Sequence, residues 1–168
     1  MSTFIETVQS RSDLIQEAFM QHIYLSFVAL AVGIAIALPL GILVARYRRI
    51  AEPVIGITAI FQTIPSLALF GFLVPLIGIG AKTALIALII YALLPILRNT
   101  YTGISNIDES MIEAGRGMGM TKGQLLWQIE FPLALTFIMA GIRKATVLTV
   151  GIATLATFVG AGGLGEIS

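Results

Sequence analysis

The sequence contains no cysteine and a single histidine, and charged residues make up only 11% of its 168 positions. Without cysteine the chain can form no disulfide, thiolate nucleophile or thiolate metal site. One histidine cannot build a histidine metal cluster, and the position of His22 at the start of an apolar segment is typical of an interfacial side chain. A soluble domain carries roughly 25% charged residues, so the charges here are too few to cover a water-exposed surface.

Apolar residues dominate instead, at 57% of the chain, with a mean hydropathy of +0.97. This composition predicts an all-α integral membrane protein. The net charge of +1 gives no reason to expect nucleic acid as a partner. No acid lies inside an apolar block beside a histidine or a nucleophile, so we expect no catalytic residues, no cofactor and no metal site, and a membrane enzyme is disfavoured.

The apolar residues form four blocks, at 23–45, 54–81, 83–97 and 133–159. The first carries no charge, and as a helix of about 34 Å it would cross a bilayer. The second contains Pro65 and Pro75 and is expected to be bent or broken. The third is short for a span unless the flanking Lys82 and Arg98 extend it by snorkelling. The fourth is long enough for one span plus a re-entrant stretch.

Two polar segments separate these blocks, at 46–53 and 98–132. The first, "RYRRIAEP", is expected to be a loop at the membrane edge. The second contains "SNIDESMIEAG", which predicts a helix capped near Ser105 or Asn106. Thr121 and Gln124 then fit a capping box for a second short helix that stops before Pro132. Two short helices joined at a glycine corner predict a compact loop module rather than a linker.

Cations fall mainly on one side of this arrangement. The inner segments hold Arg46, Arg48, Arg49, Arg98, Arg116 and Lys122, and the outer ones hold Arg11 and Lys82. The positive-inside rule therefore places residues 98–132 in the cytoplasm and the N-terminal segment, 1–22, outside the cell membrane. Residues 23–168 would form the multi-pass transmembrane domain.

Polar side chains within the apolar blocks are candidates for a translocation path. They are Gln62, Thr63 and Ser66 beside Pro65, and Thr149 and Thr154 in the last block. A broken helix can line a cavity, although for any single one of these side chains core packing is the favoured role. Arg143 and Lys144 either face a water-filled path or snorkel to the cytoplasmic edge.

Two groups of glycines could each have a functional or a structural role. Gly160, Gly162 and Gly165 satisfy G-x-G-x-x-G, but no preceding strand or βαβ unit is predicted, so a bend or close packing is the better interpretation. In the loop module, Ala114, Gly115 and Gly119 are small enough for the groove of another protein to approach the backbone. Glu113 is a candidate for a hydrogen bond within the module. A folded loop without any partner is the alternative.

Residues 113–133, "EAGRGMGMTKGQLLWQIEFPL", resemble the EAA motif of ABC importer permeases. The positions that carry the resemblance are Glu113, Ala114, Gly115, Gly119, Ile129 and Pro132, with Gly115 in place of the usual second alanine. The segments "PSLALFGFLVPLIGIG", "LLPILRNTYTGI" and "GAGGLGEI" are similar to the glycine betaine/carnitine/choline (osmoprotectant) branch.

The resemblance implies the fold of the methionine-importer-like permeases, in which a further span follows the region where this sequence ends. It implies a transport function without enzymatic activity of its own. The implied partners are two copies of an ABC ATPase subunit gripping the EAA loop, a second permease subunit (identical or different), and an extracytoplasmic substrate-binding protein. A permease for another substrate class and a small self-contained channel or carrier remain as alternatives.

Overall fold

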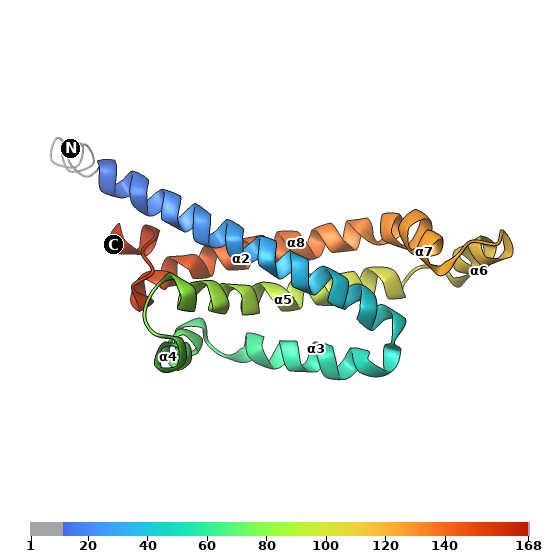
Figure 1. Cartoon of the computed structure of the whole chain (residues 1–168), viewed down its shortest axis with the longest axis horizontal. Helices are drawn as coiled ribbons and strands as arrows, with labels where there is room; N and C mark the ends of the chain where they lie inside the picture. The colour runs from blue at the N-terminus through green and yellow to red at the C-terminus, as the bar shows by residue number, and fades with distance from the viewer. Residues whose placement is uncertain (1–11, 168) are drawn as a thin grey trace.

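The computed structural model describes residues 12–167, and every regular element in that range is helical (Figure 1). Within it, three helical runs are long and apolar enough to cross a membrane: α2 (Ser12–Arg46), α5 (Ala81–Ser105) and the run 122–159, whose main part is α8 (Phe131–Ala153). A bent pair, α3 (Arg48–Thr63) and α4 (Ser66–Ile77), can supply one more. The predicted all-α membrane fold is confirmed.

The second apolar block is broken at Pro65, as expected. α3 ends at Thr63, Ile64 is extended, and the two helices meet at 98°. A residue before proline is disfavoured in the α region because of clash with the proline ring. The interrupted backbone finds partners on α5: the Tyr91 hydroxyl donates to the Ile64 carbonyl, and Gln62 Nε2 donates to the Tyr91 carbonyl at 3.3 Å. α5 therefore holds the break in place.

Two boundaries differ from the sequence-based expectation. Residues 46–53 are not a loop, because Tyr47 is the one residue between α2 and α3. The reversal is that tight because the Tyr47 amide still donates to Leu43 and the Tyr47 carbonyl accepts from Ile50. α5 also continues to Ser105, so Arg98 lies inside a helix rather than at the flank of a short span.

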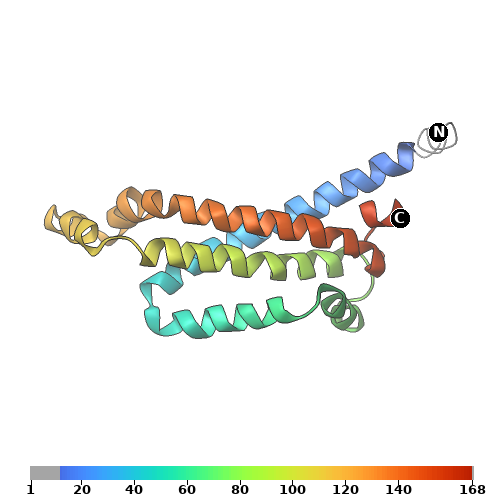
Figure 2. The same ribbon diagram turned by 180° about the vertical axis from the view of Figure 1, so that it is seen from behind.

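Small residues let α5 pack closely against both α2 and α8 (Figures 1 and 2). A Cβ on Gly141 of α8 would lie 2.7 Å from the Pro95 carbonyl oxygen and 2.7 Å from Asn99 Cβ. A Cβ on Gly41 of α2 would lie 2.7 Å from Thr100 Cβ. In lipid, helices associate through such close backbone approach rather than through the hydrophobic effect. α5 is accordingly the central helix. In its most apolar stretch 56% of the residues are buried, against 28% in the corresponding stretch of each of the other two spans.

The end of the molecule opposite the loop module is closed by glycine turns. The 3₁₀ helices η2 (Thr154–Val159) and η3 (Leu164–Ile167) are joined through Gly160, Gly162 and Gly163, all with positive φ. The G-x-G-x-x-G segment is thus a bend, as interpreted. The turn packs on α2, where the Gly163 amide donates to Gln21 Oε1 at 3.2 Å. His22 is buried there, at 3% exposure, so its side chain packs within the protein. Residues 1–11, half of the predicted N-terminal segment, lie outside the described range.

Gly141→Ala should lower the free energy of unfolding by about 1–3 kcal/mol, because the new methyl group meets a backbone carbonyl that cannot move aside. Gly151→Ala is the matched control, since that glycine lies on the same helix with no atom within 4 Å of its added Cβ. Thermal unfolding of the detergent-solubilised protein measures both. Equal effects of the two substitutions would contradict this account of the α5–α8 contact.

Candidate functional site

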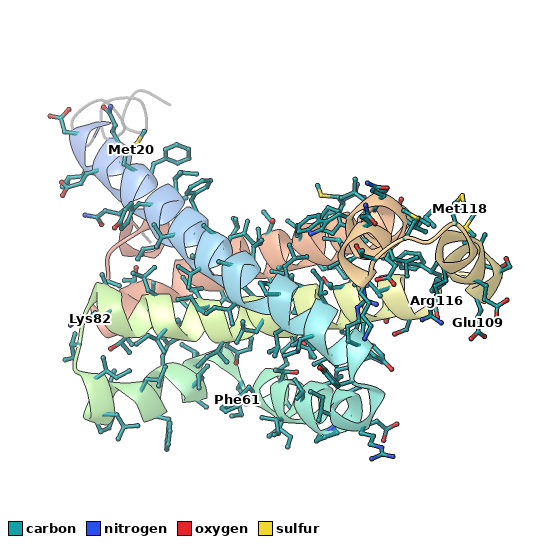
Figure 3. All side chains as sticks on the ribbon, turned by 45° about the vertical axis from the view of Figure 1, so that its right-hand side comes forward. Met20, Phe61, Lys82, Glu109, Arg116 and Met118 are labelled. Atoms are coloured by element: carbon teal, nitrogen blue, oxygen red, sulfur yellow. The ribbon has the colours of Figure 1, made fainter. Side chains whose placement is uncertain are left out.

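The loop module, residues 106–125, projects beyond the ends of α5 and α8 (Figures 1 and 3). It contains α6 (Glu109–Gly117) and α7 (Lys122–Leu125). The cap of α6 is Asp108, not Ser105 or Asn106, because α5 extends through Ser105. Asp108 Oδ1 accepts from the Ser110 amide at 2.9 Å, and this hydrogen bond lowers the pKa of the Asp108 carboxyl. Residues 98–105 are thus not part of the loop.

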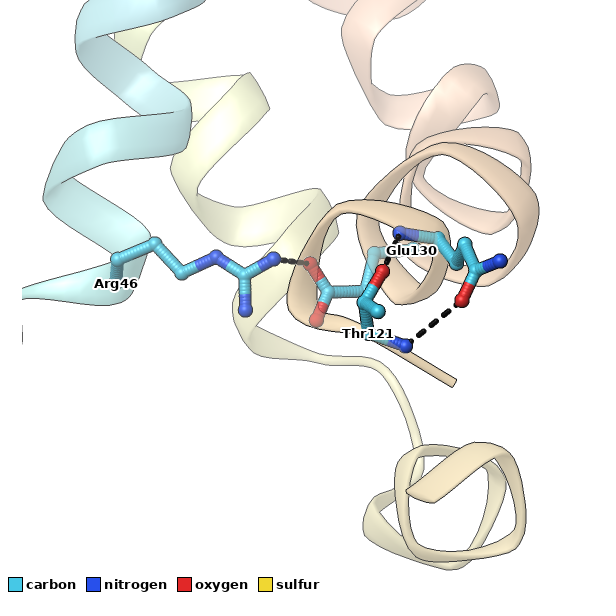
Figure 4. Close-up of polar contacts among 4 residues, drawn as sticks. Arg46, Thr121 and Glu130 are labelled. Atoms are coloured by element: carbon cyan, nitrogen blue, oxygen red, sulfur yellow. Dashed lines mark hydrogen bonds and ion pairs between the residues drawn. The ribbon is translucent and has the colours of Figure 1, made fainter. Parts of the chain in front are cut away.

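The predicted capping box at Thr121 and Gln124 is confirmed (Figure 4). The Thr121 amide donates to Gln124 Oε1 at 2.8 Å, and the Gln124 amide donates to Thr121 Oγ1 at 3.3 Å. The helix that follows does not stop before Pro132. It continues through a π-helical turn, η1 (Leu126–Glu130), into α8, where Pro132 occupies the first turn. Proline is tolerated there because the wider π turn already departs from the normal hydrogen-bond ladder.

Gly115 holds the two halves of the loop module together. It is buried, and a Cβ added to it would lie 2.7 Å from Leu125 Cδ1 and 2.8 Å from Ile129 Cδ1. The Gly115 carbonyl also accepts from the Met120 amide at 3.1 Å. Side chains of this chain therefore occupy the space that was expected to admit a partner. Gly115 and Ile129 are packing residues within the module.

Glu113, Ala114 and Gly119 lie on the outside of the module. The side chains of Glu113 and Ala114, which lie on α6, are exposed. The Glu113 carboxylate forms no hydrogen bond or ion pair with the described residues. The hydrogen bond expected of Glu113 within the module is thus not made. Gly119 has φ +80° and open space around it. A glycine is favoured here because L side chains rarely adopt that conformation.

An ion pair that sequence reasoning missed joins this region to α2 (Figure 4). Arg46 Nη2 lies 2.8 Å from Glu130 Oε2, close enough for an ion pair although the alignment is not that of a hydrogen bond. Glu130 is only 3% exposed. The two residues are far apart in the sequence and each belongs to a polar segment at a span's end. The sequence did offer one indication of this ion pair, because Glu130 is an acid that directly precedes the apolar run of the last span.

Of the candidate path residues, Gln62 lines a cleft of about 470 Å³ between α3, α5 and α8. The others lie elsewhere: Thr63 and Thr154 are exposed and donate to carbonyls of their own helical turns, and Ser66 is half-buried at the start of α4. Thr149 is fully buried in the bundle with no partner for its hydroxyl. The structure therefore does not bring these five side chains together around one cavity.

The remaining polar residues around this cleft are Arg98, Asn99, Arg143 and Lys144. Arg143 lies about 20 Å beyond Glu130 at about 1.5 Å per helical residue. That is farther than an arginine side chain reaches, so Arg143 does not extend to the level of Glu130. Arg143 and Lys144 both line the cleft, and both side chains are exposed.

The described part of the chain is thus a multi-pass helical bundle with a broken second span and a capped helical loop between its last two described spans. The model of the family described as "Binding-protein-dependent transport system inner membrane component" matches residues 37–167. The chain belongs to this family, whose members are membrane components of transport systems.

Two permeases of transport systems are similar to this chain over most of its length. The carnitine transport permease protein OpuCB of Listeria monocytogenes is 51% identical over 87% of this chain and 67% of its own length. The glycine betaine/carnitine/choline transport system permease protein OpuCB of Bacillus subtilis (strain 168) is 45% identical over 99% of this chain and 75% of its own. A chain of the MetNI methionine ABC transporter in an inward-facing conformation superimposes with a TM-score of 0.83 at 28% identity, covering 94% of this chain and 80% of that one. The methionine-importer-like fold is thereby confirmed.

The Arg46–Glu130 pair should contribute measurably to stability. Arg46→Met leaves a buried carboxylate without its cation and should lower the free energy of unfolding by about 1–3 kcal/mol. In the double variant with Glu130→Leu the loss should be smaller than the sum of the single losses. Arg49→Met is the control, because Arg49 is exposed and has no ion-pair partner among the described side chains. Strict additivity in thermal unfolding would show that the two groups are not coupled.

Proposed function

We propose that the chain is the permease subunit of an ATP-driven importer for compatible solutes of the glycine betaine, carnitine and choline type. The observation that carries this proposal is 45–51% identity, over most of the chain, to permeases whose names specify these solutes. The chain supplies the path through the membrane, and ATP is hydrolysed by a partner subunit. An extracytoplasmic binding protein delivers the solute, as the family description implies.

The loop module is the proposed contact with the ATPase. It projects from one end of the bundle, and Glu113, Ala114 and Gly119 lie on its outer surface. The other motif positions do not face outward in the same way. Gly115 is buried in the module, Ile129 of η1 packs against it, and Pro132 lies in the first turn of α8. Two ATPase copies would serve a pair of permease subunits, each subunit offering one module.

Movement of the module can reach two spans. The path to α8 is direct, because η1 makes α7 and α8 one continuous helical run. The path to α2 passes through the Arg46–Glu130 ion pair. The capping box and the contacts of Gly115 keep the module stiff, so that closure of the ATPases is transmitted rather than absorbed by the loop.

The loop-module end is proposed to face the cytoplasm, with the N-terminus outside. Arg98 no longer supports this orientation, since it lies inside α5. Arg46, Arg48, Arg49, Arg116 and Lys122 still lie at or near the loop-module end, and Lys82 lies at the opposite end (Figure 3). The excess of cations satisfies the positive-inside rule in this orientation.

The translocation path is proposed to include the cleft that contains Gln62. Polar groups beside a broken helix are typical of binding sites within transporters. Thr63, Ser66, Thr149 and Thr154 remain candidates for other parts of the path, which would have to open when α2, α5 and α8 move apart. Cysteine substitution followed by labelling from either side of the membrane tests each position.

Substitutions on the outer surface of the module should release the ATPase. Glu113→Lys reverses a charge, and Gly119→Leu forces a side chain into a conformation with positive φ. Each should reduce co-purification of the ATPase about tenfold or more, in keeping with the loss of an interface hot spot, while membrane insertion stays normal. Lys82→Glu, at the opposite end, is the control. Normal recovery of the complex together with normal solute-stimulated ATPase activity in both variants would refute the docking role.

Transport itself separates this function from the alternatives. Proteoliposomes containing the full complex should accumulate labelled glycine betaine, carnitine or choline when ATP and the binding protein are supplied. Flux through the purified chain without ATPase or ATP would instead indicate a self-contained channel or carrier. ATP-dependent uptake restricted to unrelated solutes would assign a different substrate class.

A further inference from the structure

Three cations line the cleft, two of them at about half the height of the bundle. Gln62 Nε2 contacts the Tyr91 carbonyl, and Gly141 abuts the Pro95 carbonyl. Both carbonyls lie near residue 93, the midpoint of α5 (Ala81–Ser105). Arg143 and Lys144, which line the same cleft, are therefore near the middle of the spans. Arg98 also lines it, five residues past the midpoint of α5 and about 7.5 Å nearer the loop-module end. α5 lies between α8 and α3 in the view of Figure 2.

These cations have no carboxylate partner. Among the described side chains the one ion pair is that of Arg46 with Glu130. The side-chain amides in the cleft are engaged with the backbone of α5. Asn99 Nδ2 donates to the Pro95 carbonyl, and Gln62 Nε2 donates to the Tyr91 carbonyl. Each ionised side chain at this depth costs about 2.5–3.5 kcal/mol on insertion scales, and such residues normally pair or face water. The cleft thus presents guanidinium and ammonium donors that bind no acid among the described side chains.

An anion is the ligand that this chemistry selects. Arg binds a carboxylate through two parallel N–H···O bonds, and Lys adds a point charge. Lipid phosphates are a poor match because the hydrocarbon core is about 30 Å thick, which puts headgroups roughly 15 Å from the middle. A second copy of this chain offers no carboxylate at that height, since the described acids lie toward the two ends.

We propose that this cleft receives the carboxylate of the transported solute on its way through the membrane. The inference rests on the proposed function and narrows it. Glycine betaine and carnitine carry a carboxylate beside the quaternary ammonium, whereas choline carries a hydroxyl group and a net positive charge. The cleft therefore favours zwitterionic solutes over choline as cargo.

The test measures uptake by the complete complex in proteoliposomes, with saturating loaded binding protein. Arg143→Gln and Lys144→Gln should each lower glycine betaine uptake about tenfold or more, as expected for loss of a charged hydrogen bond. Arg143→Lys, which keeps the charge, should recover part of the lost rate. Lys82→Gln is the matched control, because it removes a cation from the same fold outside the cleft and should leave uptake within about twofold. Recovery of the complex and basal ATPase activity should be normal in all variants.

Unchanged uptake in both glutamine variants would overturn the inference and leave the proposed function standing. So would a wild-type complex that transports choline but neither zwitterion. Loss of assembly in Arg143→Gln and Lys144→Gln, but not in Lys82→Gln, would also overturn it, by showing that the cations pair with another subunit. A wild-type complex that transports none of the three solutes would instead refute the proposed function.

Discussion

The close approach of α5 to α2 and α8 is the constraint on which the other features depend. Because lipid is as apolar as the helix surfaces, association must come from packing, and a Cβ at Gly41 or Gly141 would overlap the facing helix. Once α5 is fixed at the centre, its Tyr91 can satisfy the carbonyl freed at Ile64, so the break in the second span is supported. The same packing sets Arg98 of α5 and Arg143 of α8 around one cleft.

The ends of the bundle are joined by different means. At one end, hydrogen bonds and glycine turns tie the last residues to α2 through Gln21 and Gly163. At the other, the ion pair of Arg46 with Glu130 ties α2 to the π turn before α8. A charge pair at a span's end is stronger than one in open water, since Glu130 is almost fully buried. It can also break and re-form without repacking a core, which suits a joint between a moving loop and a span.

Hydropathy, proline and capping signals predicted much of this fold because each acts locally. The break at Pro65 and the capping box at Thr121 are properties of a few adjacent residues. Boundaries were less predictable: α5 runs past Arg98 because packing, not hydropathy, determines where it ends. The burial of His22 and the ion pair of Arg46 are long-range contacts that no local pattern encodes. In the EAA-like motif, the sequence identified the positions, but only the structure separates inward Gly115 from outward Glu113.

The free-energy cost of placing cations in the polar cleft bears on how a permease can bind and release its cargo. Three cations that pair with no acid among the described residues would be costly in hydrocarbon, so water must reach them whenever no anion is bound. Hydrated cations still attract a carboxylate, but they release it readily because water competes for the same donors. A path through the membrane needs a site that binds weakly enough to let its cargo leave. Cations in a wet cleft meet that requirement better than a dry, fully satisfied pocket would, since a dry pocket would retain the solute between one cycle of the ATPases and the next.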